Sequence, residues 1–245
     1  MHRIVYPGNK AQKNLIPHII NIIPPHKMYV ELFLGSGGVS RHLNLPSIAY
    51  GVEKNNCVIS TFKNVYPSGM VVINDCAISW LKNKLPALVD KYGSMVHEDI
   101  FIYLDPPYIK SSRRSMVDIY KYEMTDKDHV DLLKSILTTT AIRVRVAISG
   151  YDNPLYNKML KGWNKKYMKV CVHGKVATEV VWFNYPVPES LHQYNYIGKN
   201  RTERQRIKRK ISRWVERLKR LPGPERNAIL DHLKLKTTTL QNSQK

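Results

Sequence analysis

Residues Met28–Gly38 (MYVELFLGSGG) decide the fold. The apolar run at their start is typical of a buried strand, and the glycines that follow let the backbone turn sharply and approach a ligand closely. Ala49–Val52 reads as a second strand, and Glu53 follows it, 18 positions after Gly35. A dinucleotide fold places a ribose-binding acid roughly 20 residues after its glycine loop. Because the loop is not G-x-G-x-x-G, the pattern favours a nucleoside ligand without a pyrophosphate.

Two more predicted strands also end in polar groups. Met70–Ile73 is followed by Asn74 and Asp75, and this second acid can accept a hydrogen bond from an adenine amine. Ile100–Leu104 is followed by Asp105–Tyr108 (DPPY). Open α/β sheets bind ligands at the carboxyl ends of their strands, so these groups are predicted to meet at one edge.

The Asp105–Tyr108 tetrapeptide suits a planar ring that carries an exocyclic NH2 group. Asp105 and the free carbonyls of the two prolines are acceptors, and Tyr108 offers a flat face for stacking. A nucleobase flipped out of its helix fits this description. The simpler interpretation is a strand-to-loop turn, because Asp and Pro are common in turns.

The remaining pattern predicts strands alternating with helices, which indicates a mostly parallel sheet with helices on both faces. Helices are expected near residues 11–23, 39–44, 55–65, 77–91, 126–138 and 153–162, and a further strand at 144–148. Segments 166–172 and 178–184 are expected to pair as an antiparallel hairpin around Gly174.

Several segments, taken together, resemble the Dam-type (D12 class) family of N6-adenine DNA methyltransferases. The resemblance covers about residues 1–187. The segments that carry it are Tyr6–Lys10 (YPGNK), Glu31–Gly37 (ELFLGSG), Glu53–Asn55 (EKN), Asn74–Asp75, Asp105–Tyr108 (DPPY), Thr125–His129 (TDKDH), Ile148–Tyr151 (ISGY) and Thr178–Tyr185 (TEVVWFNY).

The resemblance implies a Rossmann-like methyltransferase fold, S-adenosylmethionine as cofactor, and a DNA methylation or restriction–modification context. It implies that Asp105 and the Pro106 carbonyl hold the amine of a flipped adenine, with Pro107 and Tyr108 completing the catalytic site. It also implies that Phe33 and Gly35 approach the methionine portion of the cofactor, that Glu53 binds its ribose and that Asp75 contacts its adenine. The full set of expected cofactor-binding residues is Tyr6, Asn9, Lys10, Glu31, Phe33, Gly35, Gly37, Glu53, Asn74 and Asp75.

One departure from the family concerns recognition of the target sequence. Dam-type enzymes usually carry a recognition region between the third strand and the catalytic tetrapeptide, but here only 29 residues separate Asp75 from Asp105. Base readout is therefore expected to be small, or to be moved to loop 109–123 or to the C-terminal segment.

The composition points to a polyanionic partner. The 245 residues include 39 Lys and Arg against 19 Asp and Glu, a formal net charge of +20, so DNA is the first candidate. The three cysteines, Cys57, Cys76 and Cys171, form no C-x-x-C pair, and no metal site is predicted. With no apolar stretch of membrane-spanning length and no signal-peptide pattern, a cytoplasmic protein of a bacterium or phage is expected. The sequence leaves open whether it is a monomer or a dimer.

The composition changes after about residue 188. Residues 189–245 carry 15 Lys and Arg against five Asp and Glu, a net charge of +10. We expect a methyltransferase domain over 1–188, a basic helical appendage over 189–235 and a disordered tail over 236–245. In the appendage, Ile207, Ile211, Trp214 and Leu218 recur at helical spacing and define one apolar face.

Basic side chains in two places are expected to contact DNA phosphates. They are Lys110, Arg113, Arg114 and Lys121 in loop 109–123, and Arg206, Arg209, Lys210 and Arg213 in the appendage. For the appendage, the alternative is a solvated helix packed on the core. For the whole chain, the alternatives are a methyltransferase acting on RNA adenine, cytosine N4 or a protein glutamine, and a non-catalytic DNA-binding protein with the same fold.

Overall fold

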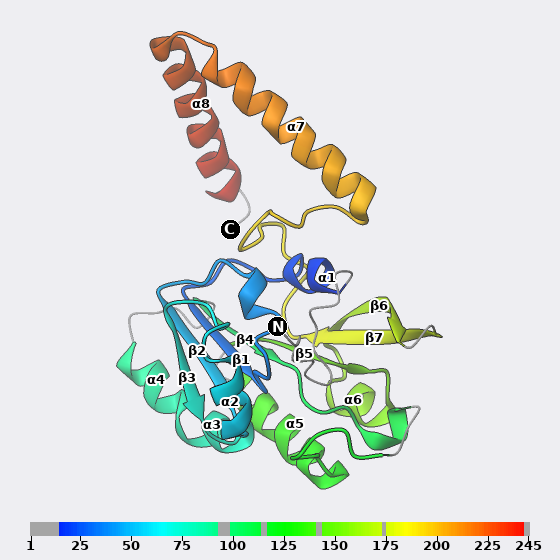
Figure 1. Ribbon diagram of the computed structural model, residues 1–245. Coiled ribbons are helices and arrows are strands. Elements are labelled where there is room, and N and C mark those ends of the chain that lie inside the picture. The colour runs from blue at the N-terminus through cyan, green and yellow to red at the C-terminus, as the bar shows by residue number, and fades with distance from the viewer. Residues whose placement is uncertain (1–14, 93–98, 114–116, 141–143, 173–174, 243–245) are drawn as a thin grey trace. The chain divides into compact units, whose positions relative to one another are not determined.

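The first part of the chain folds around a seven-stranded sheet with the strand order β3-β2-β1-β4-β5-β7-β6 (Figure 1). The computed structural model describes residues 15–92, 99–113, 117–140, 144–172 and 175–242. The strands are β1 Met28–Leu32, β2 Ile48–Glu53, β3 Met70–Asn74, β4 Ile100–Leu104, β5 Arg145–Tyr151, β6 Asn164–Val172 and β7 Lys175–Phe183.

Five strands are parallel and the last two form an antiparallel hairpin. β1 lies between β2 and β4, both of which pair with it in parallel, while β3 and β5 extend the sheet on either side. β7 pairs antiparallel with both β5 and β6. The mostly parallel sheet and the C-terminal hairpin predicted from the sequence are both confirmed.

Helices α3, α5 and α6 supply the core on one face of the sheet. Met28, Val30 and Leu32 of β1 are fully buried in a cluster with Trp80 of α3 and Leu132 of α5. The helices in this part of the chain are α1 Ile16–Ile20, α2 Asn56–Phe62, α3 Ala77–Asn83, α4 Leu85–Lys91, α5 Asp126–Thr140 and α6 Pro154–Met159.

The other face of the sheet is covered by aromatic side chains and by the segment that follows α1. Tyr29 and Phe101 alternate along their strands with the residues of the first cluster and therefore point to the opposite face. The Phe101 ring contacts the rings of His26 and Tyr185. The Tyr185 hydroxyl donates to the Ile22 carbonyl at 3.0 Å, which joins the end of β7 to the segment after α1.

Three predicted helices differ from those observed. Of the helix expected over 11–23, residues 11–14 lie outside the described part of the chain, and the helix α1 covers only Ile16–Ile20. The helix expected from Val39 to about residue 44 is only the 3-10 turn η1, Ser40–His42. Pro46 follows closely and disfavours helical geometry in the residue before it, and the His42 carbonyl instead accepts from the Gln193 side chain at 2.7 Å. The helix expected over 77–91 is divided into α3 and α4, because Pro86 has no N–H to donate to the preceding turn.

The last residues form a second compact unit, Tyr196–Lys245, which we describe separately. It contains α7 Arg201–Lys219 and α8 Gly223–Asn242. Its start lies a few residues beyond the composition change near residue 188. α8 ends at Asn242 and so includes residues 236–242 of the segment 236–245 expected to be disordered. Among the described residues, no helix is long and apolar enough to span a membrane.

Candidate active site

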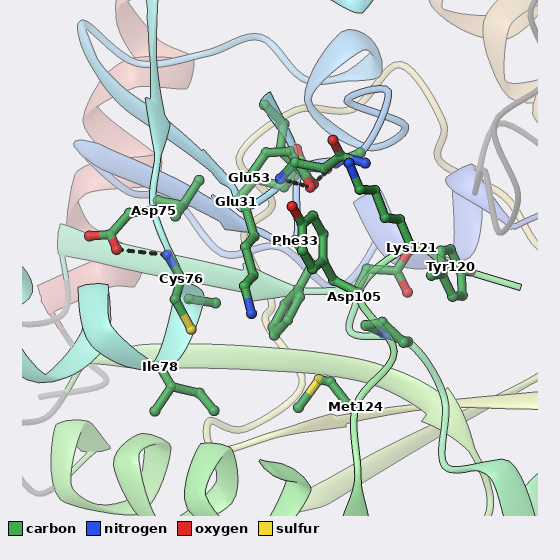
Figure 2. Close-up of a pocket in the computed structure, with 18 of the residues that line it drawn as sticks. Glu31, Phe33, Glu53, Asp75, Cys76, Ile78, Asp105, Tyr120, Lys121 and Met124 are labelled. Atoms are coloured by element: carbon green, nitrogen blue, oxygen red, sulfur yellow. Dashed lines mark hydrogen bonds between the residues drawn. The ribbon is translucent and has the colours of Figure 1, made fainter. Parts of the chain in front are cut away.

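A cavity lies at the carboxyl ends of β1, β2, β3 and β4, where the sequence predicts ligand-binding groups to meet (Figure 2). Each strand delivers polar or aromatic groups to it. The groups expected from the sequence and found in its lining are Glu31, Phe33, Gly35, Glu53, Asp75, Asp105, Pro107 and Lys121.

The glycine loop is a tight turn that needs several residues in the left-handed backbone region. Phe33, Gly35 and Gly37 have φ values of 59°, 53° and 68°, in the left-handed region. A Cβ atom on Gly37 would lie 2.9 Å from the Ser40 Oγ and 3.2 Å from the Tyr66 ring. Gly37 is therefore required for the turn but does not line the cavity, whereas Gly35 does. Phe33 is not a glycine, and such a conformation costs on the order of 1–3 kcal/mol, so the surrounding contacts must hold it.

Glu53 holds the glycine loop in place. Its Oε2 atom accepts from the Gly35 N–H at 2.9 Å, and its Oε1 atom accepts from the Asn55 N–H at 2.8 Å. Burial raises the pKa of this carboxyl group, and the backbone hydrogen bonds oppose that shift. Each carboxylate oxygen has a further lone pair, so Glu53 retains acceptor capacity for a ligand hydroxyl. The sequence predicts that Glu53 contacts the ligand, but it does not predict that Glu53 also holds the glycine loop.

Asp75 and Asn74 have different surroundings although they are adjacent. Asp75 lines the cavity, and its Oδ1 atom accepts from the Cys76 N–H at 2.7 Å. Asn74 is not among the lining residues. Its side-chain amide donates to the Glu53 and Lys54 carbonyls, both at 2.9 Å. Asn74 thus joins the ends of β2 and β3, and its expected contact with the cofactor stays a prediction.

Glu31 is a buried acid at the base of the cavity. Its Oε2 atom accepts from the Tyr29 hydroxyl at 3.0 Å and from the Ser40 N–H at 2.9 Å. Burial raises its pKa to about 7 despite these hydrogen bonds.

The Asp105–Tyr108 tetrapeptide begins where β4 ends. The Asp105 N–H donates to the Leu32 carbonyl of β1, with the two atoms 3.4 Å apart, and Asp105 and Pro107 line the cavity. Pro106 is buried and is not part of the lining. The Tyr108 hydroxyl donates to Glu179 at 2.9 Å, and its ring lies against that of Tyr151.

Loop 109–123 forms one wall of the same cavity, which changes the interpretation of its basic residues. Arg113 makes two hydrogen bonds with the Glu123 carboxylate, at 2.9 and 2.8 Å, and only 6% of its side chain is exposed. The Arg113 side chain is therefore held in an internal ion pair. This position corrects the expectation that Arg113 contacts DNA. Lys110 pairs with Asp118 at the surface, and Lys121 lines the cavity.

Glu123 organises the loop around this ion pair. Its Oε1 atom also accepts from the backbone N–H groups of Ile119 and Tyr120, at 2.7 and 3.1 Å. Burial raises the pKa of Glu123, but the hydrogen bonds from Arg113 and the two amides outweigh burial and lower it to about 2. The loop residues held in this way add lining that the sequence analysis did not assign to the cofactor: Tyr120, Tyr122, Glu123 and Met124. The mixture of aromatic and charged residues was visible in the sequence, but it did not show which way they face.

Four of the expected site residues lie outside the described part of the chain. They are Tyr6, Asn9 and Lys10 at the N-terminus and Arg114 in loop 109–123. Within the described residues, no group of His, Cys, Asp and Glu is arranged to hold a metal ion.

The lining fits a nucleoside such as the adenosyl group of S-adenosylmethionine. Acceptors for hydroxyl and amine groups, Glu53 and Asp75, lie at the ends of neighbouring strands. Apolar side chains such as Phe33, Ile78 and Met124 lie around the same space, as a flat ring requires. The lining therefore fits the cofactor that the family resemblance implies, S-adenosylmethionine.

Comparison with known proteins gives one family match, over part of the chain. Residues 90–173 match the model of the D12 class N6 adenine-specific DNA methyltransferase family, the same family that the sequence motifs resemble. The matched part contains the tetrapeptide, the loop after it and the whole of strand β6 of the antiparallel hairpin. No curated protein sequence matches the chain.

Solved structures that match the chain share little sequence with it. An rRNA methylase from Streptococcus thermophilus is 12% identical with a TM-score of 0.40, over 68% of this chain and 90% of that one. Magnesium protoporphyrin IX methyltransferase from Synechocystis PCC 6803, with bound SAH, is 8% identical with a TM-score of 0.42, over 66% and 75%. A dimethyladenosine transferase from Plasmodium falciparum is 14% identical with a TM-score of 0.43, over 74% and 62%.

Replacing Glu53 by alanine is expected to weaken binding of S-adenosylmethionine by about 1.5–3 kcal/mol, the range for a hydrogen bond to a charged group. The loss has two sources, because the substitution removes an acceptor for the ligand and releases the Gly35 N–H. Isothermal titration calorimetry measures the affinity, and Asp90→Ala, an exposed acid outside the cavity, is the control. Unchanged affinity in the Glu53 variant would remove this residue from the site.

Replacing Arg113 by alanine is expected to destabilise the fold by about 3 kcal/mol and to weaken cofactor binding, because it leaves the Glu123 carboxylate without its partner. Lys110→Ala is the matched control, since its ion pair with Asp118 is exposed and contributes at most about 1 kcal/mol. Thermal unfolding and calorimetry measure both effects. If Arg113→Ala instead lowers only DNA affinity, with stability and cofactor binding intact, the ion pair does not hold the loop.

Proposed function

We propose that the protein transfers a methyl group from S-adenosylmethionine to the N6 amine of adenine in DNA. The observation that carries this proposal is that Asp105 and Pro107 of the tetrapeptide line the same cavity as Glu53 and Asp75. A nucleoside cofactor held by these two acids would lie next to the group that holds the amine. The family match supports adenine as the base and DNA as the polymer.

In the proposed mechanism, S-adenosylmethionine supplies an electrophilic methyl group. Asp105 accepts one N–H of the amine and the Pro106 carbonyl accepts the other. Because the amine lone pair is delocalised into the adenine ring, these two acceptors are needed to shift the nitrogen toward tetrahedral geometry and to aim its lone pair. Their contribution is orientation together with stabilisation of the positive charge that develops on nitrogen.

Transfer to nitrogen needs no covalent intermediate with the protein. Cys76 lines the cavity, but the proposed reaction gives its thiol no role as a nucleophile. In this proposal the Tyr108 ring stacks on the flipped base. The base would enter from the side of the cavity bounded by the tetrapeptide.

Helix α7 is the proposed docking element for the DNA backbone. Arg206, Arg209, Lys210 and Arg213 are solvent-exposed or nearly so on its surface, and within the described part of the chain only Arg206 of these four pairs with an acid, Glu203, at 3.6 Å. These four cations lie on one side of the helix, because their spacings of three, four and seven residues match the helical repeat. Trp214 borders this side, with the Arg217 guanidinium 5.3 Å from the centre of its ring.

One assay distinguishes the proposed activity from methylation of other amines. Transfer of labelled methyl groups to duplex DNA, RNA and protein is compared, followed by identification of the methylated base. We expect N6-methyladenine in DNA. N4-methylcytosine, RNA labelling or glutamine labelling would replace the proposed substrate, and no labelling at all would favour a non-catalytic DNA-binding protein.

Asp105→Ala is expected to lower the rate of methyl transfer by on the order of 10²–10³, because it removes a positioned acceptor at the reacting centre. Cofactor binding should remain largely intact. Asp99→Ala is the matched control: Asp99 directly precedes β4, at its opposite end, and pairs with Lys27 at 2.8 Å. Turnover near that of the unmodified protein in the Asp105 variant would exclude the proposed mechanism.

Replacing Arg206, Arg209, Lys210 and Arg213 together by glutamine is expected to weaken binding to all DNA sequences about equally. It should also flatten the dependence of log K on log salt by roughly 0.9 for each phosphate that the helix no longer neutralises. A charge-matched control replaces four exposed lysines of the first unit: Lys63, Lys82, Lys84 and Lys161.

Fluorescence anisotropy over a range of salt concentrations separates the outcomes of the α7 substitution. Loss of affinity for one sequence only would make α7 a reader of bases. An equal loss in the control would show that net charge alone is responsible, and no change in either would leave α7 without a DNA contact.

A further inference from the structure

The antiparallel strand β7 brings a buried acid to the catalytic edge of the sheet. Because β7 runs against β5, its first half lies beside the carboxyl end of β5, with Glu179 opposite Tyr151. β5 in turn pairs in parallel with β4, so their carboxyl ends lie side by side. Glu179 thus reaches the place where the tetrapeptide leaves β4, although 71 residues separate it from Tyr108.

Tyr108 is held at two points by these neighbouring strands. Its hydroxyl donates to the Glu179 Oε2 atom at 2.9 Å. Its ring meets that of Tyr151 edge to face, with ring centres 4.7 Å apart and an angle of 71° between the planes. A tyrosine side chain has only two rotatable bonds before its hydroxyl, so a contact at the ring and another at the hydroxyl together fix the orientation of the ring.

Glu179 is a buried acid and not a surface acid that lies near a hydroxyl. Only 6% of the residue is exposed, on a strand whose next four residues, Val180–Phe183, are almost completely buried. A carboxyl group in such surroundings is costly unless hydrogen bonds compensate for the lost water. Its bond with Tyr108 supplies part of that compensation and also links the acid to the tetrapeptide.

We propose that Glu179 is a positioning residue that holds the ring of Tyr108 in the orientation needed to stack the target base, with Tyr151 supporting the same ring from its edge. This inference rests on the proposed function, because it concerns the side chain that would touch the base. Glu179 lies outside the lining of the cofactor cavity, so its effect should fall on DNA and not on S-adenosylmethionine.

The test compares Glu179→Ala, Glu179→Gln, Tyr108→Phe and the double variant Glu179→Ala with Tyr108→Phe. Methyl transfer is measured on unmethylated genomic DNA to give kcat and KM for DNA, and calorimetry gives the cofactor Kd. Glu179→Ala should lower kcat/KM for DNA by about tenfold or more, as expected for loss of a hydrogen bond to a charged group, with the cofactor Kd unchanged. Glu179→Gln, whose amide oxygen can still accept from Tyr108, should recover most of the activity.

The double variant separates positioning from a general effect on folding. If Glu179 acts through the Tyr108 hydroxyl, adding Glu179→Ala to Tyr108→Phe should cause little further loss. Tyr108→Phe retains the buried acid and the ring, so it tests the same bond even if Glu179→Ala does not fold.

Independent, multiplicative losses would overturn the inference, as would a weakened cofactor Kd or unchanged kcat/KM in Glu179→Ala. Those results leave the proposed function standing if the unmodified protein methylates DNA. An unmodified protein that methylates no DNA would overturn the proposed function and this inference together.

Discussion

The parallel pairing of β1 with both β2 and β4 is the constraint on which the site depends. Leu32 lies opposite Val52 on one side and Leu104 on the other, so the three strands end at the same level. The groups that follow, Gly35, Glu53 and Asp105, therefore emerge at one edge of the sheet. A shift of one residue in either pairing would turn every side chain of the shifted strand to the other face, and the cavity would lose its acceptors.

Two buried carboxylates and one half-buried carboxylate hold the loops of this site in place. Glu53 accepts from the glycine loop, Glu123 accepts from Arg113 and from two backbone amides, and Glu179 accepts from Tyr108. Each acid is withdrawn from water, so each needs hydrogen-bond donors, and in all three cases at least one donor lies on a loop beside the cavity. The requirement to satisfy these acids thus fixes the loop segments that supply the donors. Phe33, a non-glycine residue in a left-handed conformation, packs against the hydrophobic core cluster.

The two compact units have different physical characters. The first buries both faces of its sheet and contains the cavity, while α7 presents exposed apolar side chains, including Ile211 and Trp214, beside its cations. The basic residues of α7 are largely exposed, whereas Arg113, which the sequence groups with them, is enclosed by an ion pair. Basic residues therefore have two different structural roles in this protein. Only its surroundings distinguish a cation available to an external polyanion from one that stabilises a loop.

The sequence by itself determined the parallel sheet, the antiparallel hairpin and the strand ends that carry Glu53, Asp75 and Asp105. These features follow from local patterns: apolar runs, glycines that permit a turn, and polar groups directly after a strand. The sequence could not determine which residues of the loops face the cavity. Asn74 joins two strands, Arg113 turns inward to Glu123, and Glu179 reaches Tyr108 from a strand far along the chain. These roles arise from contacts between distant segments, and a side chain's partner across such a distance is set by the packing of the sheet and not by its neighbours in the sequence.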